Sequence, residues 1–371
     1  MSDLTNDLVT QIRDAAAAGG RLTIEGGASK RWYGNPVEDG AVLRTTGHTG
    51  IVDYDPAELV LTARAGTPLA ELEQVLADRG QMLAFEPPRH SVNGVSGATL
   101  GGAVATALSG PGRAFAGGVR DFVLGLHVID GKGDVLKFGG QVMKNVAGYD
   151  VSRLMTGSLG VLGLISQVSL KVLPVPPATA TLRFEMDAAR ANDQINAWSG
   201  RPLPLSATAW QAGVLHVRLS GARAAVDSAI QQLGGVRFNE VDAASLWTSL
   251  RDQSAAFFSQ GSATAVLWRL SLPQTARVVT AQDIQGADDQ LIEWGGAQRW
   301  VWSDDAAEKV RDLARSLGGH AVCFDNRQAQ RIGLLEVFDR PSAALMAVHQ
   351  RLKQTFDPQG VFNPGRLYRD M

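Results

Sequence analysis

Small residues are concentrated in the first half of the chain, and this concentration limits what that half can fold into. The stretch from Gly94 to Gly163 is crowded with Gly, Ala and Ser and holds few long charged side chains. Backbone without bulky side chains lets a ligand lie directly against the main-chain amides. The first half therefore predicts a domain whose loops approach a ligand closely.

The first such loop reads Gly26-Gly27-Ala28-Ser29-Lys30 and follows the alternating segment Arg21–Glu25, which predicts a strand. Its amides can point at a pyrophosphate, while Ser29 and Lys30 add a hydroxyl donor and a positive charge. An ordinary turn at the end of a strand accounts for the same residues equally well.

Further glycine loops follow in the same half of the chain. They lie at Gly94–Gly102, at Gly110–Gly112, at Gly117–Asp121, and over Lys144–Asp150 and Thr156–Ile165. Close packing of helices would explain some of these small residues. It explains Gly97, Gly101 and Gly102 together less well. Three glycines within seven residues of Thr156–Ile165 would weaken a strand unless something approaches its backbone.

None of these loops carries the fingerprint of the common nucleotide folds. A Rossmann site needs Gly-x-Gly-x-x-Gly between a strand and a helix, with an acidic residue about 20 positions later. The lysine motif of P-loop proteins is also missing from the sequence. The glycine loops therefore do not support an NAD or ATP site.

Charge and cysteine content exclude other classes. The net charge of −2 gives no electrostatic reason to expect nucleic acid as a partner. Cys323 is the only cysteine, and the six histidines are scattered, so we expect neither an iron–sulfur cluster nor another metal site. Without a long apolar run or a signal peptide, the sequence predicts a cytoplasmic protein with no membrane span.

A proline-rich segment at Leu173–Pro177 predicts a domain boundary. Strands predicted after it include Thr179–Met186, Val214–Leu219, Ala265–Leu270 and Ile332–Phe338, and they alternate with helical segments. We therefore expect an α+β fold with three parts. These parts are residues 1–175 as the ligand-binding domain, 178–355 as an α+β cap domain, and 356–371 as a segment that returns to the first domain.

Taken in order, the loops resemble the FAD-binding domain of the vanillyl-alcohol oxidase / p-cresol methylhydroxylase superfamily. The resemblance covers about half the chain and rests on six motifs in order: Gly26–Lys30, Ala65–Leu69, Ala98–Gly102, Gly118–Asp121, Gly157–Gly160 and Asp357–Gly365. It implies a two-part FAD-binding domain of the p-cresol methylhydroxylase type and a ferredoxin-like cap.

The resemblance also implies which residues bind FAD. Members with covalently bound flavin carry a histidine in the first loop, where this chain has Ala28-Ser29-Lys30, so we expect FAD to be held without a covalent bond. Asn363 is expected at the isoalloxazine edge, although an Asn-Pro-Gly turn explains it equally. The full expected set is Gly26, Gly27, Ala28, Ser29, Lys30, Pro87, Gly97, Ala98, Thr99, Gly101, Gly102, Gly110, Gly118, Gly160, Ile165 and Asn363.

Within the superfamily, the short length and Lys144–Asp150 resemble the FAD-binding E subunits of bacterial glycolate oxidases. That resemblance implies oxidation of glycolate to glyoxylate, with electrons passed to a larger flavoprotein D subunit and an iron–sulfur F subunit. Any association with the inner membrane would then come through these partners. The His-rich metal and substrate motif of larger members is missing here, so we do not expect the chain alone to oxidise glycolate.

Two other functions stay open, and so does the identity of the catalytic groups. The chain could be a stand-alone FAD-dependent 2-hydroxy-acid dehydrogenase of the D-lactate type, or a scaffold that has lost FAD. The family reaction needs a base and an arginine for the substrate carboxylate. Candidates are Arg89, His90, Tyr149 and Arg366, and the first three also have ordinary structural explanations.

Overall fold

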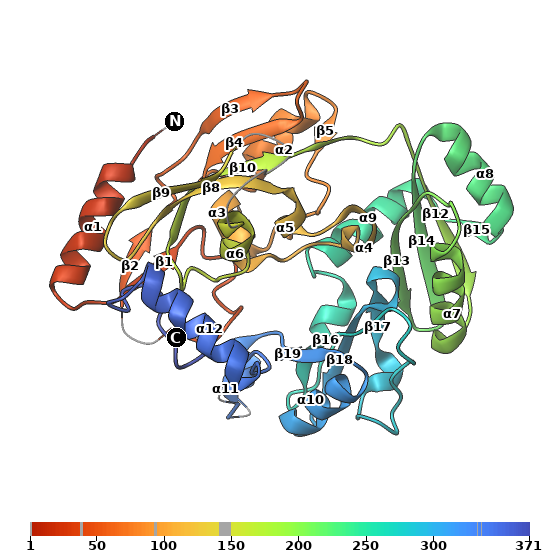
Figure 1. Cartoon of the computed structure of the whole chain (residues 1–371). Coiled ribbons are helices and arrows are strands. Elements are labelled where there is room, and N and C mark those ends of the chain that lie inside the picture. The colour runs from red at the N-terminus through yellow and green to blue at the C-terminus, as the bar shows by residue number, and fades with distance from the viewer. Residues whose placement is uncertain (1, 38–39, 93–94, 141–149, 332, 335) are drawn as a thin grey trace. The chain divides into compact units, whose positions relative to one another are not determined.

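The computed structural model describes residues 2–37, 40–92, 95–140, 150–331, 333–334 and 336–371 (Figure 1). The chain divides into two compact units. Unit 1 comprises Met1–Leu108, Gly118–Val175 and Arg340–Met371, and unit 2 comprises Ser109–Gly117 and Pro176–Asp339.

Unit 1 contains a five-stranded sheet with the strand order β3-β4-β10-β8-β9, in which all neighbouring strands are antiparallel (Figure 1). Its strands are β3 (Ile51–Asp55), β4 (Val60–Arg64), β8 (Val123–Ile129), β9 (Val135–Gly139) and β10 (Leu164–Lys171). Most of β10 is buried because it is the central strand. Its buried serines find partners on the strands beside it: Ser169 Oγ lies 2.8 Å from Thr62 Oγ1, and Ser166 Oγ donates to His127 O at 3.2 Å.

A second, smaller sheet in unit 1 joins the two ends of the chain. Strand β1 (Leu22–Glu25) pairs in parallel with β2 (Ala41–Arg44). The Leu22 amide donates to Val361 O at 2.7 Å, and the Asn363 amide donates to Leu22 O at 3.0 Å. The C-terminal segment therefore runs beside β1, immediately before the first glycine loop.

Short helices and strands complete unit 1. Helix α1 (Thr5–Ala17) buries Leu8 and Ile12 at helical spacing. The remaining elements are α2 (Leu69–Ala77), α3 (Leu100–Thr106), α5 (Val119–Phe122), α6 (Val151–Met155), α12 (Ala343–Phe356), β5 (Gln81–Met82), β6 (Ser91–Val92), β7 (Val95–Ser96) and β11 (Leu173–Pro174).

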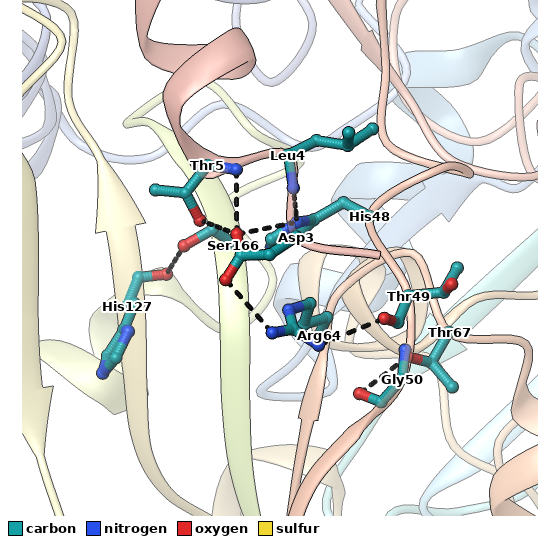
Figure 2. A network of polar contacts seen from close by, with 10 residues as sticks. All are labelled: Asp3, Leu4, Thr5, His48, Thr49, Gly50, Arg64, Thr67, His127 and Ser166. Carbon is teal, nitrogen blue, oxygen red and sulfur yellow. Dashed lines mark hydrogen bonds and ion pairs between the residues drawn. The ribbon is translucent and has the colours of Figure 1, made fainter. Parts of the chain in front are cut away.

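A polar network ties the N-terminal residues to the sheet of unit 1 (Figure 2). The Leu4 amide donates to Nδ1 of the buried His48 at 3.0 Å, and Arg64 Nη2 donates to Asp3 Oδ2 at 3.1 Å. Hydrogen bonds from Thr5 and Arg64 lower the pKa of Asp3 to about 2. Burial lowers the pKa of His48, so its ring stays neutral and Nδ1 can accept the hydrogen bond.

Unit 2 is built on an eight-stranded sheet with the order β15-β12-β14-β13-β17-β18-β16-β19, and its neighbouring strands are antiparallel. The strands are β12 (Ala178–Glu185), β13 (Leu205–Gln211), β14 (Val214–Gly221), β15 (Val236–Arg237), β16 (Val266–Ser271), β17 (Leu291–Glu293), β18 (Gln298–Ser303) and β19 (His320–Cys323). Its helices are α4 (Arg113–Ala116), α7 (Ala188–Ser199), α8 (Arg223–Leu233), α9 (Glu240–Arg251), α10 (Ala307–Ser316) and α11 (Asn326–Arg331), with 3-10 turns η1 (Ala256–Ser259), η2 (Ala287–Asp289) and η3 (Trp294–Gly296). No helix within the described ranges of either unit is long and apolar enough to cross a membrane.

One strand expected from the sequence is wrong. We predicted a strand over Ile332–Phe338, but its described residues form turns and bends. Gly333 has a φ of +67°, which interrupts an extended strand. The Cys323 amide of β19 donates to Val337 O at 3.1 Å, but the described residues form no strand beside it.

The two compact units share one border with the expected domains and group two other segments differently. The passage from Val175 to Pro176 coincides with the proline-rich segment. Helix α12, which we expected in the cap domain, groups with unit 1 because Met346 and Phe356 are buried in that unit's core. The segment Ser109–Gly117, which we expected in the first domain, groups with unit 2. The assignment of the units as FAD-binding domain and cap stays a prediction.

Unit 2 also gives a prediction about acid stability. Burial, together with the charge of Arg183, lowers the pKa of His216 in β14 from 6.5 to about 4. Below pH 6.5 the unfolded chain binds a proton at His216 that the native chain does not. The free energy of unfolding therefore decreases as the pH is lowered from 6.5. The loss reaches at most about 3 kcal/mol near pH 4.

Urea unfolding of wild type and His216→Gln at several pH values between 7 and 4 measures this contribution. The variant should lose less free energy of unfolding over this range. The same replacement at His349, which is partly exposed on α12, is the control. Equal pH dependence in wild type and His216→Gln would contradict the assignment to His216.

Candidate cofactor site

An open cleft lies within unit 1, and the space between its walls, open solvent included, is about 910 Å³. The cleft is lined by the first glycine loop, the start of α3, the turn before β10 and the C-terminal segment. Twelve of the sixteen expected FAD-binding residues line it: Gly26, Gly27, Ala28, Ser29, Lys30, Gly97, Thr99, Gly101, Gly102, Gly160, Ile165 and Asn363.

Two glycine loops that are distant in sequence touch at the wall of this cleft. A Cβ added to Gly27 would lie 1.6 Å from Gly97 O, and a Cβ added to Gly97 would lie 2.5 Å from Gly27 O. A Cβ on Gly26 would lie 2.5 Å from Thr99 Oγ1. Side chains at these positions would push the loops apart, which explains why the sequence places glycine at all three.

The first loop offers donors to a ligand. Ala28 has a φ of 56°, the left-handed conformation that turns successive amides to one side. Among the described residues, no acceptor is found for the amides of Gly27, Ala28 and Ser29. Three amides without acceptors, beside the hydroxyl of Ser29, form a concave site for an anion.

On another wall of the cleft, small residues keep side chains away from the main chain. Thr99 begins α3, and its Oγ1 accepts the Gly102 amide at 3.3 Å. Gly101, Gly102 and Ala105 face the cleft from the first turns of this helix. A planar ligand can therefore lie close to the backbone of α3.

Asn363 joins three segments at the edge of the cleft. Its Oδ1 accepts the Ile24 amide at 2.8 Å, and its Nδ2 donates to Leu159 O at 2.6 Å. A Cβ on Gly160 would lie 2.7 Å from Asn363 Nδ2, so the side chain packs tightly against that turn. The structure thus gives Asn363 a positioning role, and its contact with an isoalloxazine stays a prediction.

A buried ion pair fixes the C-terminal segment that carries Asn363. Lys353 Nζ donates to Asp357 Oδ2 at 2.6 Å and to the carbonyls of Val161 and Phe362, each at 2.8 Å. Asp357 accepts the amides of Val361 and Phe362. Burial lowers the pKa of Lys353, and the charge of Asp357 opposes that shift.

The ionisable side chains that line the cleft carry an excess of positive charge. They are Glu25, Lys30, Arg31 and Arg366, which is one acid and three bases, or a net charge of +2 at neutral pH. The carboxylate of Glu25 is already paired with Arg31 and, at 3.0 Å, with Arg44. A doubly negative diphosphate would balance this excess, and the free amides of the first loop add donors for it. The residues present therefore fit the diphosphate of FAD.

Four expected FAD-binding residues are not among those that line the cleft. Pro87, Ala98 and Gly118 are buried elsewhere in unit 1, where Ala98 O accepts the Leu69 amide and Gly118 begins α5. Gly110 belongs to unit 2, and its carbonyl accepts Trp294 Nε1 at 3.0 Å.

The catalytic candidates are also dispersed. Arg89 pairs with Glu73 of α2, and the ring of His90 lies edge-on to Trp32, with centroids 5.0 Å apart. Of the four candidates, Arg366 is the one found among the lining residues. Tyr149, together with the rest of 141–149, lies outside the described residues.

Sequence reasoning missed other residues that line the cleft. Glu25 ends β1 directly before the first glycine loop, and Thr45 follows β2. Their places at the ends of strands could have marked both residues as lining the cleft. Leu159 has a φ of 54°, an unusual conformation that no sequence pattern announces. Within the described ranges, no group of three His, Cys, Asp or Glu side chains could hold a metal ion.

Comparison with known proteins identifies the family. Residues 3–139 match the family model described as FAD binding domain. The glycolate oxidase subunit GlcE of Escherichia coli K12 is 44% identical over 369 residues, which cover 100% of this chain and 99% of that protein. The glycolate oxidase subunit GlcD of Bacillus subtilis 168 is 33% identical over 147 residues, covering 40% of this chain and 30% of that protein.

Solved structures show the same fold at much lower identity. A 4-ethylphenol oxidase from Gulosibacter chungangensis aligns with a TM-score of 0.68 and 15% identity, over 98% of this chain and 87% of that chain. An alkyldihydroxyacetonephosphate synthase aligns with a TM-score of 0.65 and 16% identity, over 98% of this chain and 76% of that chain. The expected fold of the p-cresol methylhydroxylase type is confirmed, and the chain belongs to the family of FAD-binding flavoproteins that contains the glycolate oxidase subunit GlcE.

Proposed function

We propose that this chain is the FAD-binding subunit of a glycolate oxidase, which oxidises glycolate to glyoxylate and passes the electrons to partner subunits. The observation that carries this proposal is the 44% identity to GlcE over the whole length of both chains. The cleft of unit 1, with its free amides and excess positive charge, supports binding of the cofactor that this oxidation needs.

The residues of the cleft suit cofactor binding better than proton transfer. When bound, FAD supplies the acceptor for the hydride that leaves the hydroxyl-bearing carbon of the substrate. The hydroxyl proton needs a base, yet the described lining residues include no histidine. The carboxylate of Glu25 is already paired with two arginines, Arg31 and Arg44. We infer that the base is supplied from outside the described lining of this cleft, which is consistent with a subunit that works in an assembly.

The partners that we propose are a larger flavoprotein D subunit and an iron–sulfur F subunit. The single Cys323 is buried, and burial raises its pKa to about 12, so this chain does not supply thiolate ligands for a cluster. Electron transfer beyond FAD would then take place on other subunits. We propose a cytoplasmic location, with any contact to the inner membrane made through these partners.

A stand-alone 2-hydroxy-acid dehydrogenase is the second candidate function. The D-lactate dehydrogenase of Anaerostipes hadrus is 32% identical over 165 residues, covering 44% of this chain and 32% of that protein. That match leaves most of the dehydrogenase without a counterpart here, which favours the subunit over the stand-alone enzyme.

Visible spectra of the purified chain, recorded without oxygen before and after glycolate is added, test the proposal. We expect the absorbance of bound flavin, little bleaching by glycolate alone, and bleaching once the D and F subunits are present. Rapid bleaching of the lone chain by glycolate or D-lactate would favour the stand-alone enzyme. A protein that stays colourless after incubation with FAD would contradict both.

A further inference from the structure

Arg366 holds a partly buried positive charge at the cleft. Its Nη1 donates to Asn35 O at 3.1 Å, and its Nη2 donates to Arg31 O at 2.8 Å and to Lys30 O at 3.3 Å. These acceptors are neutral carbonyls, and no carboxylate among the described residues pairs with this guanidinium. Burial and the charge of Arg31 lower the pKa of Arg366 to about 10, so it stays protonated at neutral pH.

Arg299, a guanidinium with a purely structural role in this chain, differs from Arg366 in its surroundings. Arg299 in unit 2 also bonds to three carbonyls, those of Gly296, Arg277 and Ala276, and its pKa is also lowered to about 10 by burial. Arg299 is fully enclosed in the core, however, with an exposed fraction of 0%. Arg366 instead lines a cleft, where its charge can be balanced by a ligand.

The position of Arg366 indicates which kind of anion the cleft would bind. Through Lys30 O, the guanidinium is attached to the same loop whose Gly27, Ala28 and Ser29 amides have no acceptor among the described residues. A cation bonded to the same loop as a run of free amides favours a phosphate group, which can accept several hydrogen bonds at once.

We propose that Arg366 is the counter-charge for the diphosphate of FAD, and not the arginine that binds the substrate carboxylate. The proposal rests on FAD binding by this chain and is independent of whether glycolate is its substrate. The C-terminal segment then serves the cleft in two ways, because Asn363 joins its walls and Arg366 brings positive charge to them.

Equilibrium binding of FAD and of riboflavin to the apoprotein, followed by flavin fluorescence, tests this assignment. Riboflavin has the same ring system but no phosphate. For Arg366→Gln we expect the Kd for FAD to rise about 10- to 100-fold, as for other hydrogen bonds between charged groups, while the Kd for riboflavin changes little. Arg366→Lys keeps the charge but not the planar fork, so its FAD affinity should be intermediate.

Arg223→Gln, at the exposed start of α8 in unit 2, is the control for a lost surface charge and should leave both Kd values unchanged. The proposal fails if Arg366→Gln binds FAD as tightly as wild type, which would leave the substrate carboxylate as the better partner. It also fails if the affinities for FAD and riboflavin fall by the same factor, because that pattern indicates a general loss of loop structure. If Arg366→Gln does not fold, the Lys variant decides by the same two-ligand comparison.

Discussion

Gly27→Ala is expected to yield a protein that no longer retains FAD. The new Cβ would lie 1.6 Å from Gly97 O and 2.5 Å from Gly97 C, and both are backbone atoms that no side-chain rotation can move. The first loop must shift, and its free amides shift with it. Overpacking of this kind disturbs a site by about 3 kcal/mol, so the Kd for FAD should rise about 100-fold or more.

Two other glycines make matched controls. Gly20→Ala lies outside the cleft, where its Cβ would find only Ala15 O at 3.5 Å and Ala15 Cα at 3.8 Å, so it should change nothing. Gly102→Ala lies inside the cleft, but its Cβ would meet only Thr99 Oγ1 at 3.2 Å. The Gly102 variant should therefore fold normally, and any loss of FAD affinity in it would report a direct approach of the ligand.

FAD titration and thermal unfolding of the three apoproteins separate these effects. We expect Gly27→Ala to lose affinity far beyond any loss in its melting temperature, since the clash is confined to the cleft wall. Normal FAD binding by Gly27→Ala would mean that the first and second loops do not touch in solution. The cleft would then not have the wall that these two loops form.

The glycine loops made the site predictable because their chemistry is local. A loop with no side chains signals close approach whichever segment it approaches, so Gly26–Lys30 and Gly97–Gly102 could be picked from the sequence. What the sequence could not show is that Gly27 and Gly97 meet each other, since their contact depends on the fold of the whole unit.

The failures also have physical causes. Gly110 has the same small size as the cleft glycines, but it is used in unit 2, where Trp294 Nε1 reaches its carbonyl. From the sequence, helix α12 continues the alternation of strands and helices in the second half of the chain. Its residues Met346 and Phe356 are nevertheless buried in the core of unit 1. The sequence shows that a glycine or an apolar side chain will pack closely. It does not show which segment of the chain that residue will pack against.

Lys353→Met is expected to destabilise the protein by about 3–5 kcal/mol, a large share of the stability of an ordinary domain. The side chain of Asp357 has an exposed fraction of 0%, so removing the ammonium leaves a buried carboxylate without its counter-charge. Lys353 also holds the carbonyls of Val161 and Phe362. Because Asn363 and Arg366 follow on the same segment, FAD affinity should fall together with stability.

Urea unfolding of Lys353→Met, Asp357→Asn and the double variant measures the coupling between the two groups. The double variant should be more stable than the Lys353 variant, because the neutral amide needs no counter-charge and can still accept a hydrogen bond from the Val361 or Phe362 amide. Lys309→Met is the matched control: Lys309 pairs with Asp305 at 2.9 Å with the same spacing, but its side chain is 52% exposed. This control should lose less than about 1 kcal/mol. A similar loss for both lysines would show that Asp357 remains solvated, and that the C-terminal segment is not locked onto unit 1 by this pair.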